Sequence, residues 1–420
     1  MSRSSAAAIC ALLCMIQAPS PLGADVKLPG TRGLVQRLLG NGGDSPPAQN
    51  SGGSPSPKAN DSGTDKSAGS KTRQKITLSP GSGAMRSSSG SGEFSQDQDP
   101  GKVAGSSGAE VPLPGNQSGP WQVRVRGSRH YVGSVDMQRF YQFPSHQFDG
   151  KHLWLRSPSI ILKASVGSSE LLLNNVKFIL SFPVLGEGDQ ALFSRLDLSK
   201  LIDPVLRPTH ITDGSAFDTV VVDAGHGGHD VGARGVYGYE KNYALQLSEA
   251  LREALQTRGL KVLLSRPGDE FVTLTRRVAI ANQTPRCIFI SLHFNSGGSS
   301  ATGIETFALT PQGGAASLER GGGVNWSGLV GNSHDSANIA LATAVHAQVV
   351  SRFRLVDRGI KRAQWSVLSG CTRPGILFEG GFVTNREDGL RIASPSYQRM
   401  IANAIADGIM NYRKALSRAR

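Results

Sequence analysis

The spacing of apolar residues changes twice along the chain. Residues 25–118 show almost no regular apolar pattern and are dominated by Gly, Ser, Pro, Asn, Asp, Gln and Lys. Such a segment buries too little apolar surface to offset the entropy that it would lose on ordering. Short apolar runs separated by turns follow over 119–210, and longer strand and helix patterns follow from 215 to 420. We therefore expect a disordered linker over 25–118 and then two folded parts.

The segment 119–210 has the pattern of a small β-rich α+β module. Short runs of alternating apolar and polar residues predict strands, and one helical pattern closes the segment. The predicted strands are 121–125, 151–156, 159–164, 170–173 and 177–182, and the predicted helix is 196–205. Over most of its length this segment resembles the N-terminal domain of copper amine oxidases, through Tyr131 and Val132 before a helix, Asp149-Gly-Lys, the turn at Gly167, and Val184. The resemblance implies no copper site.

Beyond 215 the patterns alternate between strands and helices. The predicted strands are 218–223, 260–264, 287–292, 303–309, 365–368 and 375–378, and the predicted helices are 240–258, 273–282, 335–353 and 396–416. This alternation predicts an α/β fold with a mostly parallel open sheet that has helices on both faces. Because chemistry in such sheets gathers at the carboxyl ends of the strands, residues that follow each strand are the first to consider.

The first residues and the overall charge bear on location. A short basic start, an apolar run over 6–16 and small residues at 22–24 are typical of a secretory signal peptide, which we assign to 1–24. No stretch is long and apolar enough to span about 30 Å of hydrocarbon, so we expect no transmembrane segment. We therefore expect export to the periplasm or cell envelope. The formal net charge of +13 favours polyanionic surroundings, although it also fits an ordinary basic protein.

Removal of the signal peptide would leave two cysteines, Cys287 and Cys371. In an exported protein they could form a disulfide bond. The alternative is a pair of separate buried thiols, with Cys287 acting as an apolar residue of a strand. The sequence leaves both interpretations open.

Residues suited to metal chemistry lie at three strand ends and at one helix start. His226 follows the first strand, His293 ends the third, Glu379 follows the strand 375–378, and Glu240 begins the first helix. Catalytic zinc is usually held by three His or carboxylate ligands, and hydrolysis then needs a further carboxylate as base. Each residue taken singly also fits a structural role, such as a helix-start carboxylate for Glu240. Glu379 is the hardest to explain in this way, because an unpaired charge among apolar neighbours is costly.

Together, the motifs resemble the zinc-dependent N-acetylmuramoyl-L-alanine amidase family, type 3, over about 217–415. The motifs are Asp-Ala-Gly-His-Gly-Gly at 223–228, Glu-Lys-Asn at 240–242, Ser-Leu-His-Phe-Asn at 291–295, Gly-Ile-Glu-Thr-Phe at 303–307, Arg-Gly-Ile-Lys-Arg at 358–362 and Phe-Glu-Gly-Gly-Phe at 378–382. Matched residue by residue, the resemblance implies that His226, Glu240 and His293 bind zinc and that Glu379 is the catalytic carboxylate. The implied reaction is hydrolysis of the amide between N-acetylmuramic acid and L-alanine in peptidoglycan, in cell-wall remodelling or daughter-cell separation.

Three further residues are candidates for a substrate groove, with a structural role as the alternative for each: His229, Asn295 and Arg362. The interval 310–334 is rich in Gly, and we interpret it as a mobile flap. Its one acid, Glu319, fits a solvated loop residue better than a metal ligand that would hold the enzyme inactive.

Two other classes of function remain open. The chain could be an inactive wall-binding protein that keeps an enzyme fold, or a zinc peptidase or deacetylase that acts on another envelope substrate. The expected partner is peptidoglycan, an activator protein is left open, and we expect a monomer that binds no nucleic acid. His334 and His346 lie outside the matched motifs and are expected to be structural.

Overall fold

The computed structural model describes residues 111–115, 121–318, 323–353 and 355–417, which fall into one compact unit. The predicted signal peptide, nearly all of the predicted linker, and Glu319 lie outside the described residues. Within the described part, no helix is both long enough and apolar enough to cross a membrane.

The N-terminal part contains short strands and short helices. Its strands are β1 (Val123–Arg126), β2 (Arg129–Gly133), β3 (Ser145–Phe148), β4 (His152–Arg156), β5 (Ile161–Ser165), β6 (Glu170–Leu173), β7 (Val176–Ile179), β8 (Leu185–Glu187) and β9 (Gln190–Ser194). Its helices are α3 (Ser134–Tyr141), α4 (Arg195–Asp197), η2 (Leu198–Ile202), α5 (Asp203–Leu206) and η3 (Pro208–His210). The last four follow one another closely along the chain and replace the single helix predicted over 196–205.

The C-terminal part alternates strands and helices. Its strands are β10 (Thr219–Ala224), β11 (Lys261–Leu264), β12 (Cys287–Asn295), β13 (Ile304–Leu309), β14 (Asp357–Ala363) and β15 (Gly375–Phe382). Its helices are α6 (Glu240–Gln256), α7 (Leu274–Gln283), η5 (Val330–His334), α8 (Asp335–Phe353), α9 (Ser366–Ser369), α10 (Arg386–Ile392) and α11 (Pro395–Ser417).

Within the described residues, one sheet of 11 strands runs through both parts, in the order β11-β10-β12-β15-β13-β14-β7-β6-β5-β4-β3. The first six strands are parallel to their neighbours, except that β13 and β15 are antiparallel. This confirms the predicted α/β class and adds one antiparallel pair to it. The two parts meet where β14 pairs with β7, with Ile360 opposite Phe178. A smaller sheet contains β1, β2, β9 and β8. The resemblance to the copper amine oxidase domain stays a prediction.

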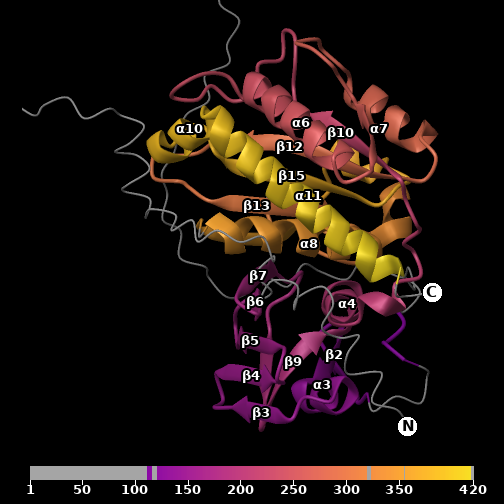
Figure 1. Ribbon diagram of the computed structural model, residues 1–420. Coiled ribbons are helices and arrows are strands. Elements are labelled where there is room, and N and C mark those ends of the chain that lie inside the picture. The colour runs from indigo at the N-terminus through magenta and orange to yellow at the C-terminus, as the bar shows by residue number, and fades with distance from the viewer. Residues whose placement is uncertain (1–110, 116–120, 319–322, 354, 418–420) are drawn as a thin grey trace, which may run out of the picture. The chain divides into compact units, whose positions relative to one another are not determined.

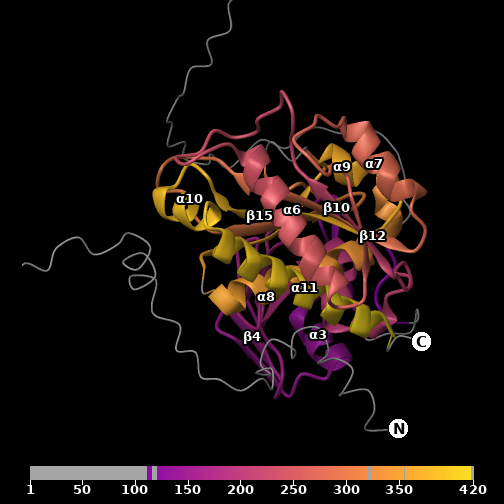
Figure 2. The ribbon, with the colours of Figure 1, turned by 45° about the horizontal axis from the view of Figure 1, so that its top comes forward.

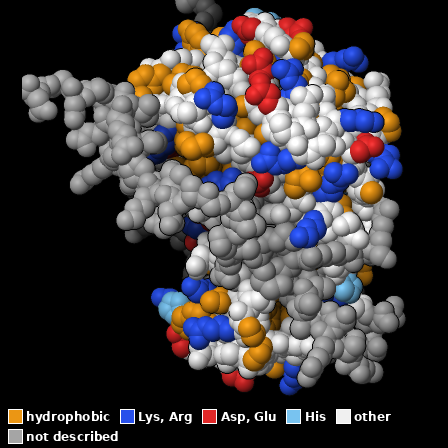
Figure 3. Space-filling view, in the orientation of Figure 1, with side chains coloured by type: hydrophobic (Ala, Val, Ile, Leu, Met, Phe, Trp, Pro, Cys, Tyr) orange, Lys and Arg blue, Asp and Glu red, His pale blue; other side chains and the backbone are white. Residues whose placement is uncertain are grey.

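Helices cover both faces of the C-terminal sheet (Figures 1 and 2). Val220 and Val222 of β10 belong to the same core cluster as apolar residues of α6, α8 and α11. Val221, between them, belongs to the second cluster, with residues of α7 and α9. Because side chains alternate between the faces of a strand, β10 is buried throughout its length. On the α6–α11 face, Lys and Arg side chains are scattered among acidic and apolar ones (Figure 3).

One predicted strand is wrong. Residues 366–369 form helix α9, and the strand of this region is β14, at Asp357–Ala363. β14 is buried although its sequence is polar: Lys361 and Arg362 are only 7% and 1% exposed. Lys361 faces the carboxylate of Glu305, and Arg362 donates to backbone carbonyls.

The two cysteines are free, buried thiols, so the disulfide is not formed in this structure. Burial raises the pKa of Cys287 to about 11. Burial likewise raises the pKa of Cys371 to about 12. The burial of both thiols agrees with the second interpretation, in which both side chains act as apolar core residues.

Candidate active site

The site begins at the loop after β10, which carries His226. Two buried arginines hold the backbone of this loop. Arg277 of α7 donates to the carboxylate of Asp223 at 2.6 Å and to the carbonyl oxygen of His226 at 2.6 Å. Arg266 donates to the carbonyls of Ala224 at 2.9 Å and Gly225 at 2.8 Å. His226 itself has a φ of 59°, an uncommon conformation that these contacts hold in place.

Glu240, the first residue of α6, is buried and lies between two histidines. Its Oε2 lies 3.1 Å from Nε2 of His226, and its Oε1 lies 2.9 Å from Nδ1 of His293. The backbone N–H groups of Ala233 and Phe294 also donate to this carboxylate, at 2.8 and 3.1 Å. Burial alone would raise the pKa of Glu240, but the two imidazoles lower it far below the usual value. These contacts favour the ionised form of Glu240.

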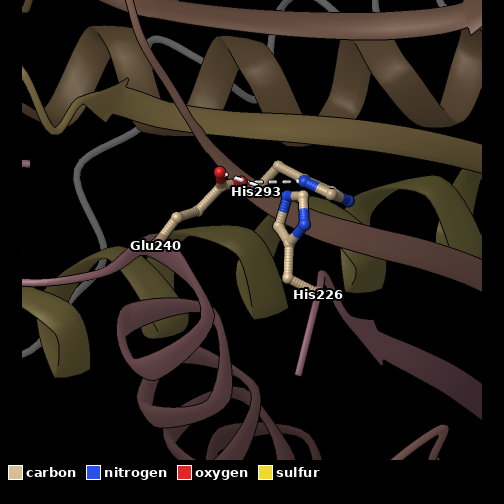
Figure 4. A group of neighbouring side chains, drawn as sticks. All are labelled: His226, Glu240 and His293. Atoms are coloured by element: carbon tan, nitrogen blue, oxygen red, sulfur yellow. Dashed lines mark hydrogen bonds and ion pairs between the residues drawn. The ribbon is translucent and has the colours of Figure 1, made fainter. Parts of the chain in front are cut away.

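The ligand atoms of His226, Glu240 and His293 all lie within 4.8 Å of one another. The three side chains point toward a common point from the loop after β10, the start of α6 and strand β12 (Figure 4). The structure thus brings together the three residues predicted as metal ligands. Two imidazoles and one carboxylate form the ligand set of many catalytic zinc sites, which leave a further position open.

Asp230 is a site residue that the sequence reasoning did not single out. Its Oδ2 lies 2.9 Å from Nδ1 of His226, so it fixes the ring whose Nε2 faces Glu240. Burial lowers the pKa of His226, but the carboxylates of Glu240 and Asp230 raise it by more. A carboxylate behind a ligating histidine is the usual arrangement at metal sites. The available signal was an acidic residue four positions after His226, just beyond the first motif.

Two glycines leave room for the ligands. A Cβ on Gly225 would lie 2.4 Å from the nearest ring atom of His293. A Cβ on Gly232 would lie 2.6 Å from Cδ2 of His226 and 2.7 Å from Oε2 of Glu240. Gly232 also has a φ of +65°, a conformation that favours glycine. Both positions therefore require the smallest residue if the ligands are to keep these positions.

Glu379 lies in the next strand, beside the ligand group. In the register of the sheet it is opposite His293 on β12 and opposite Glu305 on β13, so the three side chains share one face. Its Oε2 is inaccessible and has no hydrogen-bond partner among the described residues. Burial raises the pKa of Glu379 well above its usual range, the charges of Glu240 and Glu305 raise it further, and Lys361 opposes them. Glu379 is thus a carboxyl group that readily holds a proton.

Glu305, by contrast, is charge-paired. Its side chain is buried and contacts Arg358, and its Oε2 lies 3.1 Å from Nζ of Lys361. Arg358 also lies over the ring of Phe382, 4.9 Å from its centroid. Glu305 therefore has two cationic partners, whereas Oε2 of Glu379 has no hydrogen-bond partner among the described residues.

The three predicted groove residues lie in different environments. His229 is exposed, with its ring 4.2 Å from that of Phe271. Asn295 is half-buried at the end of β12, where its carbonyl accepts from Val383 N–H at 2.9 Å. Arg362 does not line a groove: it is buried, and its guanidinium donates to the carbonyls of Leu309 and Lys200. That correction follows from the position of β14 against the N-terminal part.

The described residues of the interval 310–334 are held by hydrogen bonds. The side chain of Asn325 donates to the carbonyl of Thr310 at 2.9 Å, and the backbone N–H of Ser317 donates to the carbonyl oxygen of Arg362 at 2.8 Å. The prediction of a mobile flap finds no support in these contacts. His334 bridges the carbonyls of Asp213 and Thr372, in the structural role expected for it.

His346 is also structural. Its ring is fully buried between Thr306 and Asp357, at 2.9 Å from each.

Comparison with known proteins gives a consistent result over the C-terminal part. Residues 220–411 match the family model described as N-acetylmuramoyl-L-alanine amidase. YqiI, an uncharacterized protein of Bacillus subtilis, is 36% identical over 194 residues, which are 46% of this chain and 84% of that protein. The sporulation-specific N-acetylmuramoyl-L-alanine amidase of B. subtilis is 31% identical, over 45% of this chain and 66% of that protein. The solved structure of the amidase AmiC2 of Nostoc punctiforme is 32% identical, with a TM-score of 0.40 over 48% of this chain and 99% of that one.

Proposed function

The chain belongs to the N-acetylmuramoyl-L-alanine amidase family, and on that premise we propose that it hydrolyses the amide bond between N-acetylmuramic acid and L-alanine in peptidoglycan, using zinc. The observation that carries the proposal is the convergence of His226, Glu240 and His293 beside the half-buried side chain of Glu379. An inactive wall-binding protein would have no need to keep these four side chains together.

We propose that His226, Glu240 and His293 hold the zinc ion. Their chemistry fits it, because Asp230 orients one imidazole and Glu240 stays ionised. A zinc ion bound there would polarise the substrate carbonyl and make water easier to deprotonate. The glycines at 225 and 232 keep the ligand side chains where they can share one ion.

Glu379 would act as the general base and then as the general acid. It accepts the proton of the attacking water, and it returns a proton to the amine of L-alanine as the amide bond breaks. Burial and neighbouring carboxylates favour the protonated form, which suits the second step. The ion group of Glu305, Arg358 and Lys361 sits on the side of Glu379 away from the zinc ligands and sets its surroundings.

His229 and Asn295 are proposed to border the substrate. The ring of His229 lies against that of Phe271 at an interplanar angle of 37°, and Phe271 is 45% exposed, so two aromatic rings lie open beside the loop of His226. Gly228 N–H and the Lys241 side chain both donate to Asp269. These contacts connect the loop after β10 and the start of α6 to the loop after β11, which carries Phe271. An open, fixed pair of rings suits the apolar face of a sugar. We place the N-acetylmuramic acid ring on this flank.

The setting of the reaction is proposed to be the periplasm or cell envelope, where the enzyme would take part in cell-wall remodelling or daughter-cell separation. The secretory pattern at 1–24 supports this location, as does a substrate that lies outside the cytoplasm.

The test pairs activity with metal content. We expect Glu379→Gln to bind zinc like the parent protein while its release of peptide from purified sacculi falls by roughly 10²- to 10⁴-fold, the usual contribution of a general acid–base group. Glu253→Gln, on the exposed surface of α6, is the matched control and should keep full activity. Undiminished peptide release by Glu379→Gln would remove that residue from the mechanism. Wild-type protein that binds zinc but releases no peptide would refute the proposed amidase activity.

A further inference from the structure

A short hairpin, residues 234–239, connects the loop that carries His226 to Glu240 at the start of α6. Arg234 and Tyr239 pair across it as antiparallel neighbours, and Gly235 N–H donates to the carbonyl of Gly238 at 2.8 Å. Ala233, directly before Arg234, donates its N–H to Oε2 of Glu240 at 2.8 Å. The base of the hairpin is therefore fixed to a metal ligand, and Arg234 is one residue away from that contact.

The tip of the hairpin is fixed on the side of β15 and α10. Val236 N–H donates to the carbonyl of Val383 at 2.9 Å. The ring of Tyr237 packs against Gly389 of α10, where an added Cβ would lie 3.2 Å from ring atom Cδ2. In the sheet, β15 and β11 lie on opposite sides of β10 and β12. The hairpin therefore covers the flank opposite to the loop that follows β11, which carries Phe271.

Arg234 is exposed at this flank without an acidic partner among the described residues. Its guanidinium lies 5.5 Å from the ring centroid of Tyr239, a cation–π contact that leaves its N–H donors open. Val236, Tyr237 and Tyr239 are 53%, 44% and 38% exposed. An open guanidinium among exposed apolar side chains is typical of a binding surface.

Nearby carboxylates are already engaged. Asp230 binds His226 and the N–H of Gly232. Glu387 of α10 pairs with Arg391, and Asp388 accepts from Thr302 and from backbone N–H groups. Arg234 therefore has its charge available for a ligand from outside the chain.

We propose that Arg234 binds a carboxylate on the peptide part of the substrate, and so sets the direction in which the substrate lies across the metal site. This inference rests on the proposed amidase function. The scissile amide separates a sugar from a peptide, and a peptide ends in a carboxylate unless it is blocked. A planar guanidinium matches a carboxylate with two parallel hydrogen bonds. The aromatic pair on the opposite flank then faces the sugar.

The experiment compares two probes: N-acetylmuramoyl peptide with free carboxylates, and the same compound with every peptide carboxylate amidated. We measure kcat and KM for wild type, Arg234→Gln, Arg234→Lys, and Arg286→Gln as the matched control. Arg286 is an exposed arginine that precedes β12, at the end of that strand opposite to His293.

Wild type should prefer the free-acid probe by roughly 10- to 100-fold in kcat/KM, the effect of one charge-assisted contact. In Arg234→Gln that ratio should fall close to one through a higher KM for the free acid. Arg234→Lys should keep part of the preference, and Arg286→Gln should match wild type. A full preference in Arg234→Gln, or equal losses on both probes, would overturn the inference. Wild type that cleaves neither probe would instead count against the amidase function.

Discussion

The glycine at position 232 offers a sharp test of the metal site, through the variant Gly232→Ala. The new Cβ would lie 2.6 Å from Cδ2 of His226, whereas carbon atoms in contact lie about 3.5 Å apart or more. One of them must move by about 0.9 Å. Metal–ligand distances tolerate only about 0.2 Å, and the same Cβ would also press on Glu240. Two of the three ligands would be displaced at once.

Backbone strain must be separated from this displacement. An alanine at a φ of +65° costs roughly 1–2 kcal/mol in any setting. Gly259 has a φ of +76° and no atom within 4 Å of an added Cβ, so Gly259→Ala carries similar strain without a clash. In urea unfolding of the metal-free protein, Gly232→Ala should lose at least as much stability as Gly259→Ala, because the backbone strain is similar and the clash adds to it.

The assay is a zinc titration against a chromogenic chelator at fixed pH. Gly232→Ala should bind zinc at least roughly tenfold more weakly than wild type, the scale seen when the support of a ligand is disturbed. Gly259→Ala should bind it with wild-type affinity. Equal zinc affinity in wild type and both glycine variants would refute the assignment of His226 and Glu240 as joint ligands.

Three further outcomes are expected. Glu305→Gln removes a charge that raises the pKa of Glu379. Because a general base loses activity as the pH falls through its pKa, the acidic limb of the kcat/KM profile should move to lower pH. A move to higher pH would contradict the influence of Glu305 on Glu379, which lies opposite to it in the sheet. Phe271→Ala should raise KM for a muramoyl probe several-fold to about tenfold, since one aromatic contact contributes on that scale, with kcat nearly constant; an unchanged KM would exclude the ring from the substrate surface. Cys287 and Cys371, with pKa values raised to about 11 and about 12 by burial, should resist alkylation at pH 8 until the protein is unfolded, and rapid modification of the folded protein, followed by mass spectrometry, would show that they are accessible.

Much of the catalytic fold could be predicted because its sequence and its burial agree. The predicted helix at 335–353 coincides with α8, and the strand 218–223 matches β10 within one residue. Strand β14 was missed because its Lys and Arg side chains are buried through ion pairs and carbonyl contacts formed with residues far away in the sequence. Hydrophobic periodicity cannot register a charge whose partner lies on another strand.

The site shows the same division. The motifs were enough to predict His226, Glu240, His293 and Glu379, and the structure brings the first three together with Glu379 in the adjoining strand. Asp230 and Phe271 were not predicted, because their roles depend on which loop lies against which. Arg362 was misassigned for a related reason, since only the fold shows that β14 is enclosed by the N-terminal part.

The identity of the products tests the proposed amidase activity most directly. Metal-free protein is incubated with purified sacculi, zinc is added back, and the released material is analysed by mass spectrometry. We predict zinc-dependent release of peptides that begin with a free L-alanine amine, together with glycan whose lactyl groups end in free carboxylates. Shortened peptides still attached to the sugar, a deacetylated glycan, or an intact sacculus after zinc has been restored would contradict the proposed activity.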